Sequence, residues 1–161
     1  MTHELTCSVV HPASSPDCDT VLMVLGTLEG ERRLVGWGSH RALLTPKCFK
    51  FLSKLAVAAF AEPGRWVKRE ELERGDNQAR YLYRLRGELE SQCGRLPDLW
   101  ENNRRGSYRL TLQPERIHID WDSLLGDDDW DLVAWVKAFE SGAGPARRVR
   151  LASVEGQTVA A

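Results

Sequence analysis

The sequence, 161 residues long, has few of the features that mark membrane, exported or metal-binding proteins. No apolar run approaches the ~20 residues that a membrane-spanning helix requires. The chain opens with Met1-Thr2-His3-Glu4, without a basic stretch before an apolar one, so we expect no secretory signal. Its cysteines are scattered, and no pair has metal-ligand spacing: Cys7, Cys18, Cys48 and Cys93. We therefore expect reduced thiols in a cytoplasmic protein without a bound metal.

The sequence also lacks the short motifs of common enzyme sites. It has no P-loop, no dinucleotide-binding fingerprint and no nucleophile–base pair, so we expect neither catalysis nor a cofactor. The acidic run Asp127-Asp128-Asp129, followed by Asp131, lacks the alternating oxygen ligands and the glycine of a calcium loop. We expect these carboxylates at the N-terminal turn of the following helix, where the helix dipole favours negative charge.

Charge is unevenly distributed along the chain, although its net value is only −1. From Arg41 to Leu112 there are 15 Lys and Arg against 9 Asp and Glu, whereas from Gln113 to Glu140 there are 2 against 8. A basic centre beside an acidic segment is typical of a nucleic-acid-binding surface with a non-binding appendage. Solvated charged faces are the alternative, and charge alone does not separate the two interpretations.

Hydrophobic patterning and turn residues predict an α+β fold. After a loose leader, residues 1–19, with room for a strand at Leu5–Val10, we expect an antiparallel meander. Its strands are Thr20–Leu28, Leu34–Trp37 and Ala42–Leu44. Helices follow from Pro46, at Arg69–Arg74 and at Asn77–Gln92.

The first long helix is predicted to be amphipathic. Thr45 is expected to cap its free backbone donors, and Pro46 suits its first turn because no N–H is needed there. The expected buried stripe consists of Phe49, Leu52, Leu55, Ala56 and Phe60. The opposite, polar face is expected to carry Lys47, Lys50 and Lys54.

The helix over Asn77–Gln92, for which Asp76 is the expected N-cap, has its charge sorted by face. One stripe holds the residues expected to meet the core: Gln78, Leu82, Leu85 and Leu89. The opposite stripe holds two guanidinium groups, a phenol and a position without a side chain: Arg80, Tyr83, Arg84 and Gly87. Arg86 lies near the boundary between the stripes. Such a helix fits a DNA major groove, and the alternative is a solvated face with ion pairs to Glu88 or Asp76.

A basic hairpin follows this helix. Leu99–Asn102 and Ser107–Leu112 are expected to pair around a tip at residues 103–106. Arg104 and Arg105 lie at this tip, where little core needs covering, and Asn102 is a candidate DNA contact that also suits the turn. A major-groove helix followed by a basic hairpin is the layout of a winged helix-turn-helix. The candidate DNA-binding residues are Arg80, Tyr83, Arg84, Arg86, Gly87, Asn102, Arg104 and Arg105.

Four short motifs occur in an order that resembles the OmpR/PhoB-type winged-helix effector domains. They are Leu44-Thr45-Pro46-Lys47-x-Phe49, Pro63-Gly64-Arg65-Trp66-Val67-x-Arg69-Glu70-Glu71-Leu72, Arg84-Leu85-Arg86-x-x-Leu89 and Tyr108-Arg109-Leu110. The resemblance covers about residues 20–112, and the segment after the hairpin is more weakly similar to SARP-type bacterial activators. The resemblance to the OmpR/PhoB-type domains implies that the helix over residues 77–92 enters the major groove and that the hairpin tip approaches the minor groove. Lys68 stands where the family usually has a helix-capping serine.

The segment after Gln113-Pro114 is predicted as an acidic appendage, residues 115–140, outside a DNA-binding domain of residues 20–114. It contains a strand, Arg116–Trp121, and a helix, Trp130–Glu140, and residues 141–161 are expected to form a flexible tail. The helix has one apolar face, made of Leu132, Trp135, Val136 and Phe139. This face either docks on its own domain or binds a second copy of the chain or another protein. We favour binding to a second copy or another protein over docking within the chain.

These patterns together predict a sequence-specific regulator of transcription that binds double-stranded DNA, of bacterial type. The alternative is a winged-helix module that binds protein through the tryptophan-bearing acidic appendage. The segregation of Arg80 and Arg84 from the leucines, together with Arg104 and Arg105, favours DNA.

Overall fold

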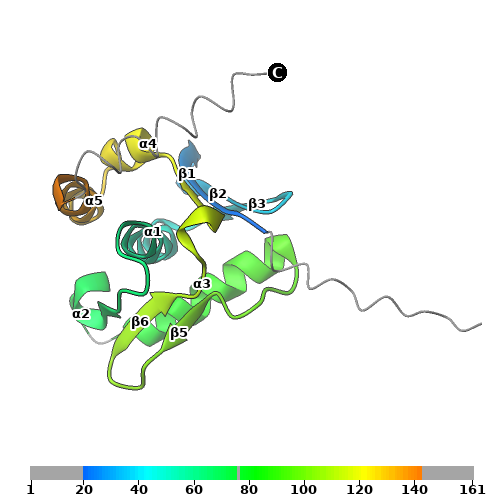
Figure 1. The fold of residues 1–161 in the computed structure, drawn as a ribbon. Helices are drawn as coiled ribbons and strands as arrows, with labels where there is room; N and C mark the ends of the chain where they lie inside the picture. Colours follow the sequence, from blue (N-terminus) through cyan, green and yellow to red (C-terminus); the bar gives the residue numbers. More distant parts are fainter. Residues whose placement is uncertain (1–19, 76, 143–161) are drawn as a thin grey trace, which may run out of the picture.

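The computed structural model describes residues 20–75 and 77–142 and shows an α+β fold with two small β-sheets (Figure 1). None of the described helices combines the length and hydrophobicity needed to cross a bilayer. The leader with its expected strand at Leu5–Val10, the expected cap Asp76 and residues 143–161 lie outside the described residues.

The first sheet begins with the predicted antiparallel meander. Its strands are β1 Leu22–Glu29, β2 Arg32–Trp37 and β3 His40–Leu44. Gly30 adopts a φ of 64° in the tight turn between β1 and β2, a conformation that favours glycine. A fourth strand, β7 Ile117–Ile119, lies parallel to β1, so the order is β3-β2-β1-β7.

The predicted strand Arg116–Trp121 is therefore shorter than expected, and Trp121 begins a helix instead. Asp120 ends the strand because its side chain accepts a hydrogen bond from the Ser123 backbone at 3.1 Å and caps α4, Trp121–Leu125. Segment 115–140 was expected to form an appendage, but β7 lies in the first sheet. This segment contributes to the same core as the preceding elements.

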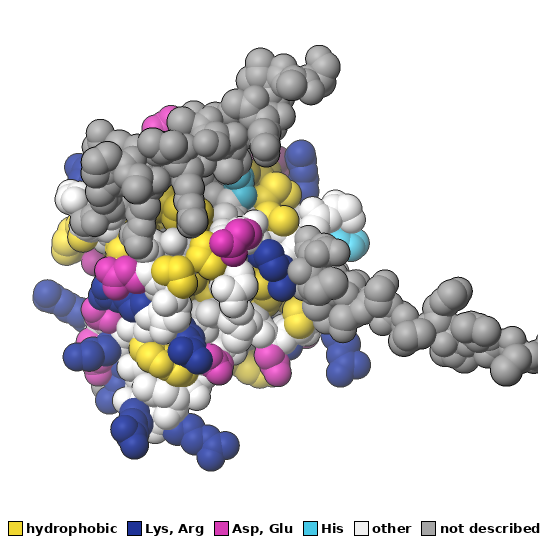
Figure 2. Space-filling model, viewed as in Figure 1, with side chains coloured by type: hydrophobic (Ala, Val, Ile, Leu, Met, Phe, Trp, Pro, Cys, Tyr) yellow, Lys and Arg dark blue, Asp and Glu magenta, His cyan; other side chains and the backbone are white. Residues whose placement is uncertain are grey.

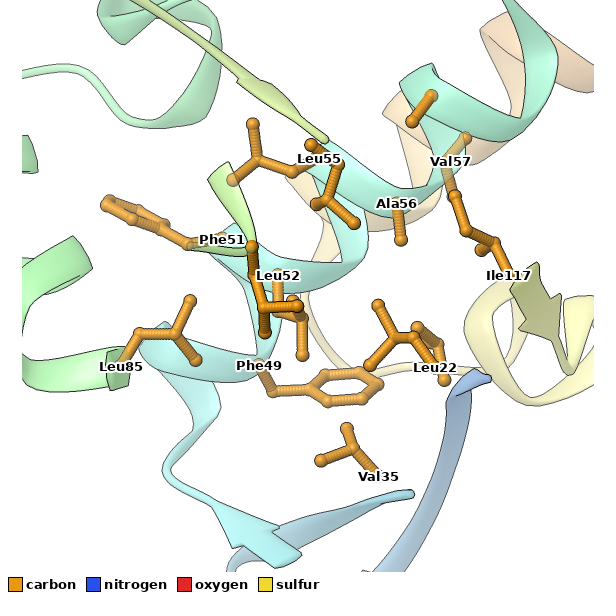
Figure 3. Close-up of a cluster of buried hydrophobic side chains, with 14 of the residues drawn as sticks. Leu22, Val35, Phe49, Phe51, Leu52, Leu55, Ala56, Val57, Leu85 and Ile117 are labelled. Atoms are coloured by element: carbon orange, nitrogen blue, oxygen red, sulfur yellow. The ribbon is translucent and has the colours of Figure 1, made fainter. Parts of the chain in front are cut away.

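Helix α1, Pro46–Ala61, is buried on nearly every side because both sheets and the helices α2, α3 and α5 surround it. In Figure 3 the Phe49 ring lies beside Leu22 and Val35 of the first sheet. The expected polar face is wrong for two of its three lysines, since Lys50 and Lys54 are 5% and 1% exposed. Thr45 makes no side-chain capping bond, because its hydroxyl donates to Glu88 instead.

Helices α2 and α3 follow, and α3 packs against α1 and β3. Their bounds are Arg69–Leu72 and Gln78–Cys93. A second sheet has the order β4-β6-β5 and places a two-residue strand beside the expected hairpin. These strands are β4 Val67–Lys68, β5 Trp100–Asn102 and β6 Ser107–Leu110.

Helix α5, Trp130–Gly142, lies against α1 on the side away from α3 (Figure 1). Leu132 and Val136 are fully buried there, Phe139 is 8% exposed, and the Trp135 indole donates to the Lys54 carbonyl at 3.1 Å. The apolar face on which we expected a partner is thus covered within the chain. Docking on its own domain, the alternative outcome, is what the structure shows.

The acidic loop before α5 and the first turn of α5 pair with buried basic side chains, a feature that the sequence did not predict. Arg33 donates to Asp127 at 2.7 Å, and these two side chains are 7% and 5% exposed. Asp131 accepts from Lys50 at 2.8 Å and from Lys54 at 2.7 Å. Asp129 has the expected place at the helix start, since its side chain accepts from two backbone N–H groups of the first turn.

Burial affects the protonation of this cluster in both directions. Burial is the main cause that lowers the pKa of Lys54. For Asp131, burial alone would raise the pKa, but hydrogen bonds and charge from Lys50 and Lys54 outweigh it and lower the pKa. The Lys50 pKa is raised, because its carboxylate neighbours outweigh its own desolvation. The acidic loop, α1 and α5 are therefore held together by ionised pairs.

Candidate nucleic-acid interface

Helix α3 has the two faces that its sequence predicts. Gln78, Leu82, Leu85 and Leu89 are buried, which confirms the expected core stripe. On the opposite face, Arg80, Tyr83, Arg84 and Gly87 are all exposed, and Tyr83 is 82% exposed. An exposed tyrosine between two exposed arginines presents hydrogen-bond donors and an aromatic surface to solvent.

Side-chain hydrogen bonds anchor α3 at both ends. At its start, the Gln78 amide donates to the Glu73 carbonyl at 2.7 Å and to the Gly75 carbonyl. Near its end, the Gln92 side chain accepts from the Leu43 N–H at 2.7 Å and donates to the Leu43 carbonyl at 2.9 Å. These contacts fix the helix relative to β3, so its exposed face has a defined orientation.

Arg84 shares a carboxylate with the start of α1. Its Nε lies 3.3 Å from Glu88 Oε1, and Glu88 also accepts from the Thr45 hydroxyl at 2.8 Å and the Thr45 N–H at 3.1 Å. The ion pair to Glu88 was the alternative interpretation for this arginine, and it is present. The Arg84 side chain is nevertheless 58% exposed, so its outer nitrogens remain accessible. Beneath this cluster, burial raises the pKa of the Cys48 thiol.

Gly87 has no internal reason to be glycine. A Cβ at this position would meet nothing within 4 Å, and its φ is not positive. Glycine in the middle of a helix costs about 1 kcal/mol relative to alanine. A helix surface that is bare at this point leaves room for close approach by a ligand.

Arg86 is engaged within the protein. Its guanidinium lies 3.0 Å from Glu90 and 3.4 Å from Asp98, and it donates to the Leu96 carbonyl at 3.0 Å. These contacts hold the loop between α3 and β5 in place. The structure therefore gives this candidate an internal role.

The hairpin tip projects beyond the body of the protein, with basic side chains at its end (Figure 2). The Asn102 side chain accepts from the Arg104 N–H at 2.8 Å, and the Asn103 side chain accepts from the Arg105 N–H at 2.8 Å. Arg104 adopts a φ of 59°, and Gly106 one of 82°. The asparagines thus shape the turn, as expected, and the Asn102 carboxamide oxygen is occupied by that task. Both arginine side chains are exposed, and neither forms an ion pair with a described residue.

The base of the hairpin is tied to the start of α2. The Arg69 N–H donates to the Gly106 carbonyl at 2.9 Å, and Lys68 lies opposite Ser107 in the β4–β6 register. The Glu71 carboxylate accepts from the Lys68 N–H at 2.8 Å and so satisfies a backbone donor at the start of α2. Lys68, which stands where the OmpR/PhoB-type domains usually have a capping serine, is exposed. Its place beside the hairpin makes it an additional candidate phosphate contact.

The sequence predicted the faces of α3 but not the hydrogen bonds that join this helix to distant elements. The spacing of α3 indicated its faces, but no local pattern indicated that Glu88 and Gln92 bond to residues more than 40 positions earlier. Within residues 20–75 and 77–142 no cluster of three or more His, Cys, Asp or Glu side chains has a geometry suited to a metal ion.

Comparison of the chain with protein-family models, with curated proteins and with solved structures gives no match.

Proposed function

We propose that this protein is a sequence-specific regulator of transcription that binds double-stranded DNA through a winged helix-turn-helix. In this proposal α3 enters the major groove, and the β5–β6 hairpin is the wing, which meets the backbone or the adjacent minor groove. The order α1, α2, α3 and hairpin, with β4 pairing to the hairpin, supports it.

The exposed face of α3 carries the proposal. Arg80, Tyr83 and Arg84 are exposed, and Gly87 leaves the helix surface bare between turns. Arg80 forms no ion pair with any described residue. Surface arginines without a structural task, on a helix whose other face is fixed in the core, suit contacts to phosphates and base edges.

The rival function, protein binding through the acidic segment, has a smaller exposed apolar surface than the sequence predicted. Trp135, Leu132 and Val136 pack against α1. Asp127 and Asp131 are engaged by basic side chains of the same chain. Unlike Trp135, Trp130 is largely exposed, at 78%.

Salt dependence of DNA binding tests the proposal. Fluorescence anisotropy with labelled genomic fragments, starting from the region upstream of the protein's own gene, should show affinity that falls steeply with salt. Each neutralised phosphate contributes a slope of about −0.9 in log K against log[salt]. The double variant Arg104→Ala/Arg105→Ala should make this slope shallower by the contribution of about two phosphate contacts, because both arginines lie at the tip.

Arg32→Ala is the matched control, since Arg32 is an exposed arginine at the start of β2 in the other sheet. Its slope should equal that of the wild type. Absence of binding to any duplex at low salt, or binding that does not respond to salt, would exclude DNA as the partner.

A further inference from the structure

Glu88 occupies an unusual position on α3, between the exposed face and the core. It follows Arg84 by one helical turn, and its side chain is only 14% exposed. Both carboxylate oxygens are occupied: Oε1 accepts from the Thr45 hydroxyl at 2.8 Å, and Oε2 accepts from the Thr45 N–H at 3.1 Å. The carboxylate is thereby fixed from another element.

The start of α1 favours a negative charge in this place. Thr45 immediately precedes α1 and makes no capping bond of its own, and α1 is 16 residues long. A carboxylate near the N-terminus of a helix is stabilised by the helix dipole. The Glu88 side chain is therefore fixed by Thr45 whether or not Arg84 is present.

This fixed carboxylate holds one edge of the Arg84 guanidinium. The contact is to Nε, at 3.3 Å, and the side chain remains 58% exposed. Among the described residues no other ion pair involves Arg84, so its two terminal nitrogens are available to a ligand. A guanidinium held at Nε loses fewer conformations when its outer nitrogens form a bidentate contact.

The other exposed arginines of the interface have no such anchor. Arg80, Arg104 and Arg105 form no ion pair with a described residue, which suits contacts to the repetitive phosphate backbone. Reading of a base edge requires a defined direction, because the hydrogen-bond pattern of each base pair is specific. Arg84 alone among these combines exposure with a fixed carboxylate.

We infer that Glu88 is a positioning residue that aims Arg84 at a base edge and so determines the sequence specificity of binding. This inference depends on the proposed DNA-binding function and adds to it the residue that carries specificity. Thr45 is the third member of the arrangement, because its hydrogen bonds to Glu88 fix this carboxylate relative to the start of α1.

The test measures discrimination between two duplexes. A preferred site is first selected from a random duplex library with the wild-type chain, and a scrambled duplex of equal length serves as reference. The readout is the ratio of the two dissociation constants at one salt concentration. Arg84→Ala should reduce this ratio by about tenfold, since a bidentate base contact contributes roughly 5- to 150-fold.

Glu88→Gln should reduce the ratio by about fivefold without weakening binding to the scrambled duplex. The variant keeps the side-chain size but removes the charge that holds Arg84, and it also removes a negative charge near the DNA. A purely structural role for Glu88 would instead weaken binding to both duplexes equally. In the Arg84→Ala background, Glu88→Gln should cause no further loss of discrimination.

Glu90→Gln is the matched control, because Glu90 pairs with Arg86 at 3.0 Å with the same four-residue spacing on the same helix. It should leave the ratio unchanged. Thermal midpoints are recorded for every variant, and Thr45→Val supplies a second test if Glu88→Gln fails to fold. Thr45→Val removes one hydroxyl contact to Glu88 and should lower the ratio in the same direction by a smaller factor.

The inference is overturned if Glu88→Gln or, where that variant does not fold, Thr45→Val retains the wild-type ratio, or if the Arg84 and Glu88 effects are additive. Either result would leave the proposed function intact, because the wild-type chain would still bind its site. Failure of the wild-type chain to bind any duplex at low salt would instead end the proposed function as well.

Discussion

Two groups of basic side chains in this molecule have opposite surroundings. Lys50, Lys54 and Arg33 are buried and paired with carboxylates of the acidic loop before α5 and of the first turn of α5. Arg80 and the arginines at the hairpin tip are exposed and form no ion pair with described residues. The basic side chains of residues 33–105 are therefore divided between a structural role in the core and a role on the surface.

This difference changes how the charge of the chain is interpreted. The acidic segment after Gln113 is not a separate appendage, because Asp127 and Asp131 neutralise lysine and arginine inside the fold. Removing those internal pairs from consideration leaves α3 and the hairpin as regions where basic side chains face solvent. The net charge of −1 gives no indication of this basic surface, which becomes apparent only when the internal ion pairs are known.

Truncation after residue 114 should have the largest effect on the structural group. It removes β7 from the first sheet, α5 from α1, and the carboxylates of Asp127, Asp129 and Asp131 that pair with Arg33, Lys50 and Lys54. Because uncompensated buried charges are strongly destabilising, we expect loss of cooperative thermal unfolding, measured by circular dichroism. A chain ending at residue 142 keeps all described contacts and is the control. A cooperative transition in the 1–114 chain would restore the interpretation of an independent appendage.

Within α1, Lys54 and Lys47 should separate buried from exposed lysine. Lys54 donates to the Glu71 and Leu72 carbonyls and to Asp131, whereas Lys47 is 43% exposed and pairs with Glu73 at 3.2 Å. We expect Lys54→Ala to lower the free energy of unfolding by about 3 kcal/mol, because it leaves buried acceptors without a donor. Lys47→Ala should cost less than about 0.5 kcal/mol. Urea denaturation measures both, and equal costs would contradict the distinction.

Periodicity in the sequence predicted α3 well because its pattern is local. Leucines at helical spacing define the buried stripe, and the arginines of the opposite face were placed correctly. The same reasoning failed for α1, where Lys50 and Lys54 appeared on a polar face. Their acidic partner Asp131 is 77 or more residues away, and nothing in the local pattern indicates that another helix will cover them.

Pairing between distant strands was the other feature that local patterns did not reveal. The strand around Ile117 was recognised, but its parallel pairing with β1 connects residues that are about 95 positions apart. An apolar face on a short helix likewise predicted that something covers α5, without indicating that α1 does. The two faces of α3 and the turn at the hairpin tip were more predictable than the packing between distant elements, because helix spacing and turn residues are local signals.

Gly87→Ala should separate stability from binding on the exposed surface. A Cβ there would meet nothing within 4 Å, so the substitution should raise the free energy of unfolding by about 0.5–1 kcal/mol through helix propensity. The same methyl group should weaken DNA binding if the DNA approaches this part of the helix closely. Thermal melts and duplex titrations measure the two effects. A variant that is more stable and binds normally would show that Gly87 has no part in the interface.

The smallest expected effect concerns the pH dependence of the structural group. Hydrogen bonds and charge from Lys50 and Lys54 lower the Asp131 pKa below its usual 3.8, in spite of the opposing effect of burial. A carboxyl whose pKa is lowered by folding stabilises the folded state above its unfolded pKa, and this stabilisation is lost as pH falls through the folded pKa. Asp131→Asn should therefore be less stable than the wild type at pH 6, and the difference should shrink below about pH 4. Asp98→Asn is the control, because Asp98 is 93% exposed and lies near α3. Urea midpoints at pH 6, 5, 4 and 3 measure the difference, and a gap of constant size down to pH 3 would mean that the ionised form of Asp131 contributes nothing to holding α5 on α1.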